Sequence, residues 1–132
     1  MKKNKLITID GPAASGKGKI SSYISKKWSF KHLDSGILYR ALAYRLLKKN
    51  INLDSADEVK KSLKFINKIS FRKYKGLRNE HISKAASKIA VYQSVRYFIN
   101  RIQQNYVNEN ISYTGFVVDG RDIGSKVFKN AD

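Results

Sequence analysis

A glycine-rich segment at residues 11–17, with the sequence G-P-A-A-S-G-K, limits the possible folds of this chain more than any other part of it. The segment fits the pattern G-x-x-x-x-G-K, follows a short apolar run at residues 6–9 and precedes a helical pattern. In such a loop, glycines let successive backbone N–H groups turn toward a phosphate, and the following helix N-terminus adds a positive dipole. A turn that binds nothing is the alternative, and the strand–loop–helix context disfavours it. We therefore predict that this loop binds a nucleotide phosphate, with Lys17 as the positive charge.

The position after the lysine departs from the usual motif. A Ser or Thr normally follows, and its hydroxyl helps to hold Mg²⁺. Here Gly18 takes that place and Lys19 comes next. We expect metal binding by this loop to be indirect or impaired, although the whole segment should still contact the nucleotide: Gly11, Pro12, Ala13, Ala14, Ser15, Gly16, Lys17, Gly18 and Lys19.

Hydrophobic periodicity predicts an α/β protein. Apolar runs indicate strands at residues 6–9, 30–33, 68–74 and 115–119, and helical spacing indicates helices at 35–49, 55–66, 82–90 and 95–102. The helix after the loop has one apolar face, formed by Ile20, Tyr23, Ile24 and Trp28. This order of strands and helices predicts a parallel sheet.

Two of the predicted strands end in the same way. Asp10-Gly11 follows the first strand, and Asp119-Gly120 follows the last. Ligands of open parallel sheets gather at the carboxyl ends of the strands. Both strand ends are therefore suited to a phosphate site.

A second motif, L-D-S-G-I-L-Y-R, occupies residues 33–40. Asp34 or Ser35 can cap the helix that begins there, and Arg40 lies one to two turns into that helix, where it can face a second phosphate. A capped surface helix without a ligand explains this segment equally well.

A third motif, V-V-D-G-R-D-I-G, occupies residues 117–124. Asp119 can hold Mg²⁺ through water, Arg121 offers a fork for a phosphate, and Asp122 can accept a hydrogen bond from an amino group. Taken alone, D-G-R-D is an ordinary turn about as often as it is a site.

Composition narrows the class of protein. The chain of 132 residues is long enough for one domain and contains no cysteine, which excludes disulfides and thiolate metal sites. The net charge of +17 fits a polyanionic partner such as nucleic acid, but the lysines are scattered, so a solvated lysine-rich surface is the favoured interpretation. The apolar run at residues 6–9 is too short for a signal or a membrane span, so we expect a cytoplasmic protein.

Together the motifs resemble bacterial cytidylate kinases, of the nucleoside-monophosphate kinase group. The resemblance covers residues 9–18, 33–42, 85–90, 95–96 and 117–124, in an order and spacing that agree along almost the whole chain. It implies a three-layer P-loop kinase fold with a parallel sheet, in which residues 1–132 form a single domain and residues 55–83 form a shortened monophosphate-binding insert.

The resemblance also implies a reaction and its residues. ATP would phosphorylate CMP or dCMP with Mg²⁺, and the catalytic residues would be Lys17, Arg121 and Asp119, the last holding the metal through water. No general base is required, and neither His32 nor His81 is a candidate for that role. We expect a monomer without a membrane or nucleic-acid partner. The residues that bind CMP would be Ser35, Arg40, Ser87, Arg96, Arg121 and Asp122.

The sequence differs from the family pattern in three respects. Gly18-Lys19 replaces the G-T of the family's G-K-G-T, and the insert between Ile69 and Ser83 is short. The family continues past the position of Asp132 into a lid and an R-D-x-x-D-x-x-R segment. We therefore expect a fragment or a truncated gene product, with an unpaired sheet edge at Val118, marginal stability and little activity. A non-catalytic relic, or a module that binds phosphate or nucleic acid, is the alternative.

Overall fold

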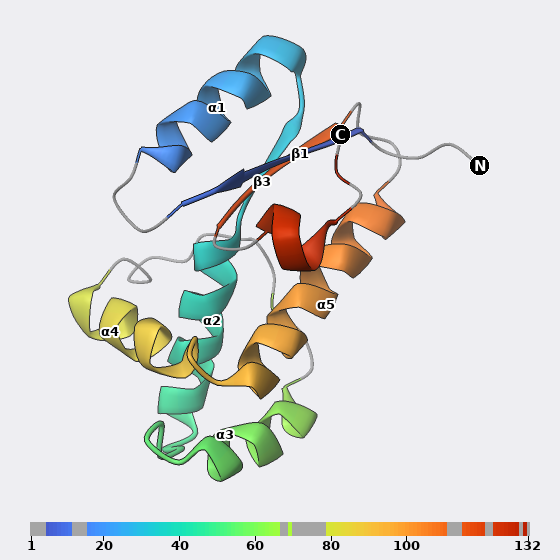
Figure 1. Ribbon diagram of the computed structural model, residues 1–132. Helices are drawn as coiled ribbons and strands as arrows, with labels where there is room; N and C mark the ends of the chain where they lie inside the picture. Colours follow the sequence, from blue (N-terminus) through green and yellow to red (C-terminus); the bar gives the residue numbers. More distant parts are fainter. Residues whose placement is uncertain are drawn as a thin grey trace. The chain divides into compact units, whose positions relative to one another are not determined.

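The computed structural model describes residues 5–11, 16–66, 69, 79–110, 115–120, 123–129 and 131 (Figure 1). The chain divides into two compact units. The first unit combines Met1–Ser35 with Gln103–Asp132, and the second is Gly36–Ile102.

The first unit is built on a parallel sheet in the order β1-β3-β2. These strands are β1 (Lys5–Asp10), β2 (Lys31–Asp34) and β3 (Gly115–Gly120). The register pairs Ile9 with Asp119 on one side of β3 and Leu33 with Val118 on the other. Strands of one sheet thus come from both ends of the chain, and the predicted α/β class with a parallel sheet is confirmed.

The expectation of an unpaired edge at Val118 is wrong. β3 is the central strand, hydrogen-bonded to β1 on one side and to β2 on the other, and all of its residues are buried. The apolar run Phe116, Val117 and Val118 suits a strand that is covered on both faces.

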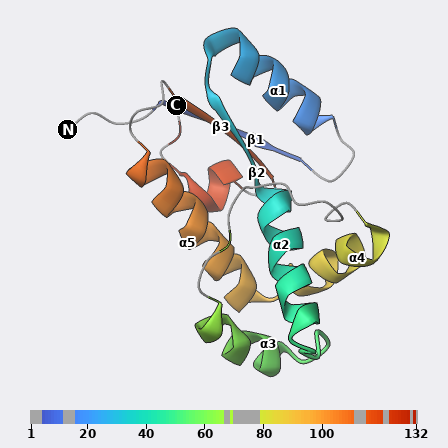
Figure 2. The same cartoon turned by 180° about the vertical axis from the view of Figure 1, so that it is seen from behind.

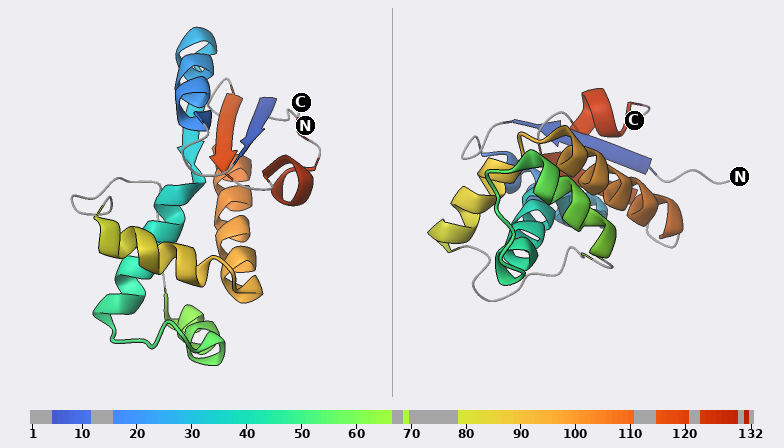
Figure 3. Two further views of the ribbon diagram at one scale, coloured as in Figure 1. Left: turned by 60° about the vertical axis from the view of Figure 1, so that its left-hand side comes forward. Right: turned by 90° about the horizontal axis from the view of Figure 1, so that it is seen from below.

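Helices cover both faces of this sheet. Figures 1 to 3 show α1 (Lys17–Trp28) on one side of the strands and the π-helix Ile123–Val127 on the other. The C-terminal half of α5 (Gln93–Glu109) joins the second side, where Tyr106 packs edge-on against Phe116 with 6.1 Å between ring centroids. Because side chains alternate along a strand, Asp119 lies on the opposite face of the sheet from Phe116.

The packing of α1 differs from its apolar pattern. Ile20, Tyr23 and Trp28 are 53 %, 64 % and 49 % exposed, whereas Ser21 is fully buried. The Ser21 hydroxyl donates to the carbonyl oxygen of Lys17 at 2.8 Å, so this small polar residue is satisfied within the helix. Of the four residues of the predicted apolar face, Ile24 alone is partly buried and the other three are exposed.

The second unit is a cluster of helices with a continuous apolar core. It contains α2 (Ser35–Lys48) from its second residue onward, α3 (Ala56–Ser62), a 3-10 turn (Leu63–Phe65), α4 (Glu80–Ile89) and the first ten residues of α5. Leu38, Leu42 and Leu46 are fully buried, which confirms the prediction from their spacing by four. Each contributes about 1.5–3 kcal/mol by burial.

The remaining helix predictions are confirmed with small shifts. Ser55 caps α3 by accepting a hydrogen bond from the backbone N–H of Glu58 at 3.2 Å, and the last turn before Ile66 is 3-10 rather than α. The strand expected at residues 68–74 lies outside the described residues except for Ile69, which is buried and in no strand. Within the described part of the chain, we find no helix with the length and apolar character needed to cross a bilayer.

Candidate nucleotide-binding site

The phosphate loop joins β1 to α1 at the carboxyl end of the sheet. The backbone N–H of Gly11 donates to the carbonyl oxygen of Gly120 at 3.0 Å, which ties the start of the loop to the end of β3. Gly16 has φ of 87°, in the left-handed region that favours glycine, and Lys17 is the first residue of α1. The loop residues 12–15 lie outside the described part of the chain. The glycine and lysine that end the motif thus stand at a helix N-terminus, as the sequence predicted.

The two positions after Lys17 offer no hydroxyl. Gly18 and Lys19 are both exposed in the first turn of α1. A Cβ built on Gly18 meets nothing within 4 Å, so the missing Ser or Thr is not excluded by packing.

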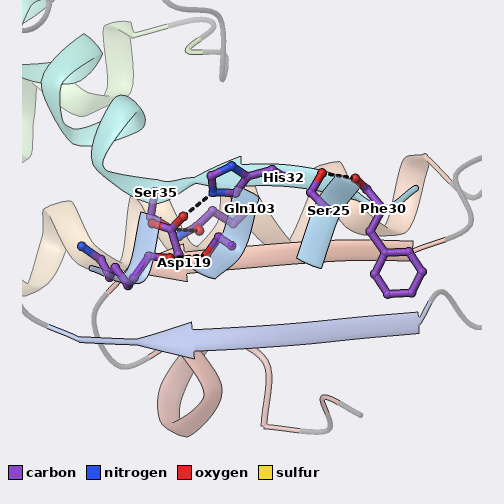
Figure 4. Close-up of polar contacts among 8 residues, drawn as sticks. Ser25, Phe30, His32, Ser35, Gln103 and Asp119 are labelled. Atoms are coloured by element: carbon purple, nitrogen blue, oxygen red, sulfur yellow. Dashed lines mark hydrogen bonds and ion pairs between the residues drawn. The ribbon is translucent and has the colours of Figure 1, made fainter. Parts of the chain in front are cut away.

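Asp119 is the buried carboxylate of the site. It is 2 % exposed, and its Oδ2 is in contact with Nε2 of His32 on β2 (Figure 4). The register explains this pair: His32 aligns with Val117, so the His32 side chain shares a sheet face with Asp119, two residues farther along β3. The imidazole is 26 % exposed and the carboxylate 4 % exposed. An expected metal-organising carboxylate is therefore held by a histidine that was set aside in the sequence analysis.

Asp10, the last residue of β1, makes different contacts from Asp119. Its carboxylate accepts from the backbone N–H groups of Ile123, at 2.5 Å, and Gly124, at 3.2 Å. It aligns with Gly120, so it lies on the other face of the sheet from Asp119. Of the two strand-end aspartates, Asp10 anchors the π-helix and Asp119 faces the side of α1.

Ser35 is buried where β2 meets α2. Its hydroxyl donates to Oε1 of Gln103 on α5 at 2.5 Å, and the two residues are 3 % and 0 % exposed (Figure 4). The Gln103 amide nitrogen has no hydrogen-bond partner among the described residues. A Cβ at Gly120 would lie 2.9 Å from the Ser35 hydroxyl, so glycine is required beside this pair.

Three expected CMP-binding residues belong to the second unit. Arg40 is half-buried on α2, and Ser87 on α4 and Arg96 on α5 are exposed. The Nε of Arg96 donates to the carbonyl oxygen of Ala90 at 2.7 Å, which fixes part of the guanidinium against the end of α4. Burial raises the pKa of the Tyr39 phenol, and the positive charge of Arg96 opposes that shift.

Two of the expected site residues cannot be placed relative to the others. Arg121 and Asp122 lie outside the described part of the chain, so their roles stay predictions. Conversely, His32 and Gln103 were not predicted as site residues. The spacing of His32 could have indicated it, because His32 lies two residues before Asp34 and the two side chains therefore share one face of the strand. No local pattern distinguished Gln103 from its neighbour Gln104 on the helix.

The donor set around Asp119 suits a cation that is bound mainly by other ligands. Among the described residues, no cluster of three or more His, Cys, Asp or Glu side chains could hold a metal. Mg²⁺ in phosphoryl-transfer sites takes one or two carboxylates, waters and substrate phosphates. The Asp119 carboxylate, with its Oδ2 held by His32 and with the phosphate loop following the neighbouring strand β1, fits that arrangement.

Comparison with known proteins identifies the family. The family model for cytidylate kinase matches residues 7–132. A cytidylate kinase of Fusobacterium nucleatum is 36 % identical over 97 % of this chain and 61 % of its own length. One from Rickettsia prowazekii is 39 % identical over 98 % of this chain and 56 % of its own length. A bifunctional pantoate ligase/cytidylate kinase of Prochlorococcus marinus is 34 % identical over 100 % of this chain and 28 % of its length. The chain therefore spans little more than half of the first two relatives, and it belongs to the cytidylate kinase family.

Proposed function

We propose that the protein transfers the terminal phosphoryl group of ATP to CMP or dCMP, giving ADP and CDP or dCDP. The observation that carries this proposal is the arrangement at one end of the sheet. The phosphate loop follows β1, and the neighbouring strand β3 brings Asp119 to the same end, on the face covered by α1. Membership of the cytidylate kinase family supports CMP as the acceptor.

Catalysis would be positional and electrostatic. A phosphate oxygen of CMP attacks the γ-phosphorus of ATP, the bond from that phosphorus to the β–γ bridging oxygen breaks, and ADP leaves. The attacking oxygen carries no proton that must be removed, so no general base is needed. Lys17 and the loop N–H groups would hold the ATP phosphates and offset their charge. Mg²⁺, when bound, neutralises charge on the phosphates, and Asp119 would hold it through water.

The CMP side of the site is proposed from the family pattern and from side-chain chemistry. Arg40 and Arg121 would bind the CMP phosphate, because guanidinium groups match its geometry. Asp122 would accept from the cytosine amino group, Ser87 and Arg96 would complete the contacts to the base, and Ser35 would lie in the monophosphate site. We propose that the protein works as a monomer in the cytoplasm, where both nucleotides are present.

The test is Mg²⁺-dependent formation of ADP from ATP and CMP by the gene product that contains residues 1–132, at its natural length. Lys17→Ala should reduce turnover by about a hundredfold or more, the scale for loss of a preorganised transition-state contact. Lys26→Ala, at an exposed lysine in the last turn of the same helix, is the matched control and should leave turnover unchanged. Unchanged turnover in Lys17→Ala, with an unchanged melting temperature, would refute the proposed role of the loop.

A further inference from the structure

The contact between His32 and Asp119 is specific in its geometry. The two side chains come from neighbouring strands and meet on one face of the sheet, with Nε2 of the imidazole on Oδ2 of the carboxylate (Figure 4). The carboxylate is nearly buried, whereas the imidazole is partly exposed. The contact therefore restricts rotation of the Asp119 carboxyl group and engages Oδ2 rather than Oδ1.

The orientation of the Asp119 carboxylate matters more for cation binding in this protein than in one whose phosphate loop has a Ser or Thr hydroxyl. Neither Gly18 nor Lys19 has a side-chain hydroxyl to offer to a cation on the nucleotide phosphates. The orientation of the cation then depends more strongly on the nearby carboxylate. Groups that orient a metal-binding side chain without touching the metal commonly change metal affinity by about 10–100-fold when they are removed.

We propose that His32 is a positioning residue for the nucleotide-bound divalent cation, acting through the Asp119 carboxylate. This inference rests on the proposed function. His32 holds Oδ2, so that Oδ1 is presented toward the hydrated cation beside the phosphate loop. It touches neither nucleotide nor cation, and its effect should appear in the metal-dependent part of ATP binding.

The measurement is the dissociation constant of ATP, by calorimetry on the full chain, with Mg²⁺ and again with EDTA. The ratio of the two constants is the gain in ATP affinity due to the metal. In His32→Leu this gain should fall about tenfold, the scale for lost metal-orienting contacts, while binding in EDTA stays the same. His32→Gln, which places an amide N–H donor near the position of Nε2, should recover most of the gain.

Two controls separate positioning from folding. His81→Leu changes the other histidine, which is exposed on α4, and should leave the ratio unchanged. In an Asp119→Asn background, His32→Leu should cause no further loss, since both residues act through one carboxylate. His32→Val, with a side chain suited to a strand, is measured beside His32→Leu so that the result does not depend on one variant folding.

An unchanged ratio in a folded His32→Leu or His32→Val variant would overturn this inference and leave the proposed function standing. An equal loss of ATP affinity with and without metal would also overturn it, because that pattern indicates a general structural defect. Absence of ATP binding in the unsubstituted chain would overturn the proposed function, and this inference with it.

Discussion

The Asp10 carboxylate accepts a hydrogen bond of 2.5 Å from the backbone N–H of Ile123, which joins the end of β1 to the π-helix 113 residues later. Ile123 is almost fully buried, so the N–H would lack a partner without this carboxylate. Asp10→Ala should lower the free energy of unfolding by about 1–3 kcal/mol, and Asp10→Asn by less, because the amide keeps one acceptor oxygen.

Chemical denaturation followed by the fluorescence of Trp28, the single tryptophan, measures this effect. Asp57→Ala is the control, because its salt bridge to Lys61 joins two exposed side chains and should be worth under about 1 kcal/mol. Equal stability of Asp10→Ala and Asp57→Ala would show that the anchor on Ile123 is unimportant.

Gly16 and Gly18 form a matched pair for testing the loop geometry. A Cβ at either position meets nothing within 4 Å, but Gly16 alone of the two has a left-handed backbone, with φ of 87°. Gly16→Ala should therefore destabilise the protein by about 1–2 kcal/mol and weaken ATP binding. Gly18→Ala, inside α1, should stabilise it by about 0.5–1 kcal/mol. Melting curves and ATP titrations of both variants decide this, and shifts of the same sign would contradict it.

Replacing Lys19 by threonine tests the departure in the phosphate loop. The G-K-G-T pattern of the resembling kinases places a hydroxyl at this position, which is exposed here. Lys19→Thr should increase the gain in ATP affinity due to Mg²⁺ several-fold, because a hydroxyl can reach the hydrated cation. The ratio of the ATP dissociation constants in EDTA and in Mg²⁺ measures this gain. Lys26→Thr is the control for loss of positive charge. A ratio that stays constant or falls would show that Lys19 does not limit metal binding.

The buried pair Ser35 and Gln103 should couple stability to CMP binding. Ser35→Ala removes the donor to Gln103 and leaves the buried Oε1 without it, at a cost of about 1–3 kcal/mol. Gln103→Leu in the same background should recover part of this loss, since it removes the unpaired amide. Because Ser35 is proposed to lie in the monophosphate site, its replacement should also raise KM for CMP more than KM for ATP. A double-mutant cycle with additive effects would show that the pair is uncoupled.

Local patterns were sufficient for most helices and strands. The helical spacing of Leu38, Leu42 and Leu46 and the apolar run before Asp119 each reflect one element, and both were found as predicted. The glycine and lysine at the end of the phosphate loop were also found at the start of a helix. Such features follow from neighbours within a few residues, which a sequence displays directly.

Pairings between distant segments could not be predicted in the same way. The central position of β3 depends on strands from distant parts of the chain. The contact between His32 and Asp119 joins residues 87 positions apart, and the contact between Ser35 and Gln103 joins residues 68 positions apart. The apolar pattern of α1 was misleading for a related reason. Which face of a helix is buried depends on the partner surface, and in α1 Ser21 is buried whereas Ile20 and Tyr23 are exposed.

A competition among CMP, UMP, AMP and GMP as phosphate acceptors tests the central claim most directly. The gene product that contains residues 1–132 is supplied with ATP, Mg²⁺ and all four monophosphates, and the diphosphates are quantified over time. CDP should form first and in large excess, because a site that hydrogen-bonds one base rejects others that leave its polar groups unpaired. Equal rates for the four acceptors, or a preference for AMP or GMP, would contradict the proposed specificity for cytidine monophosphates.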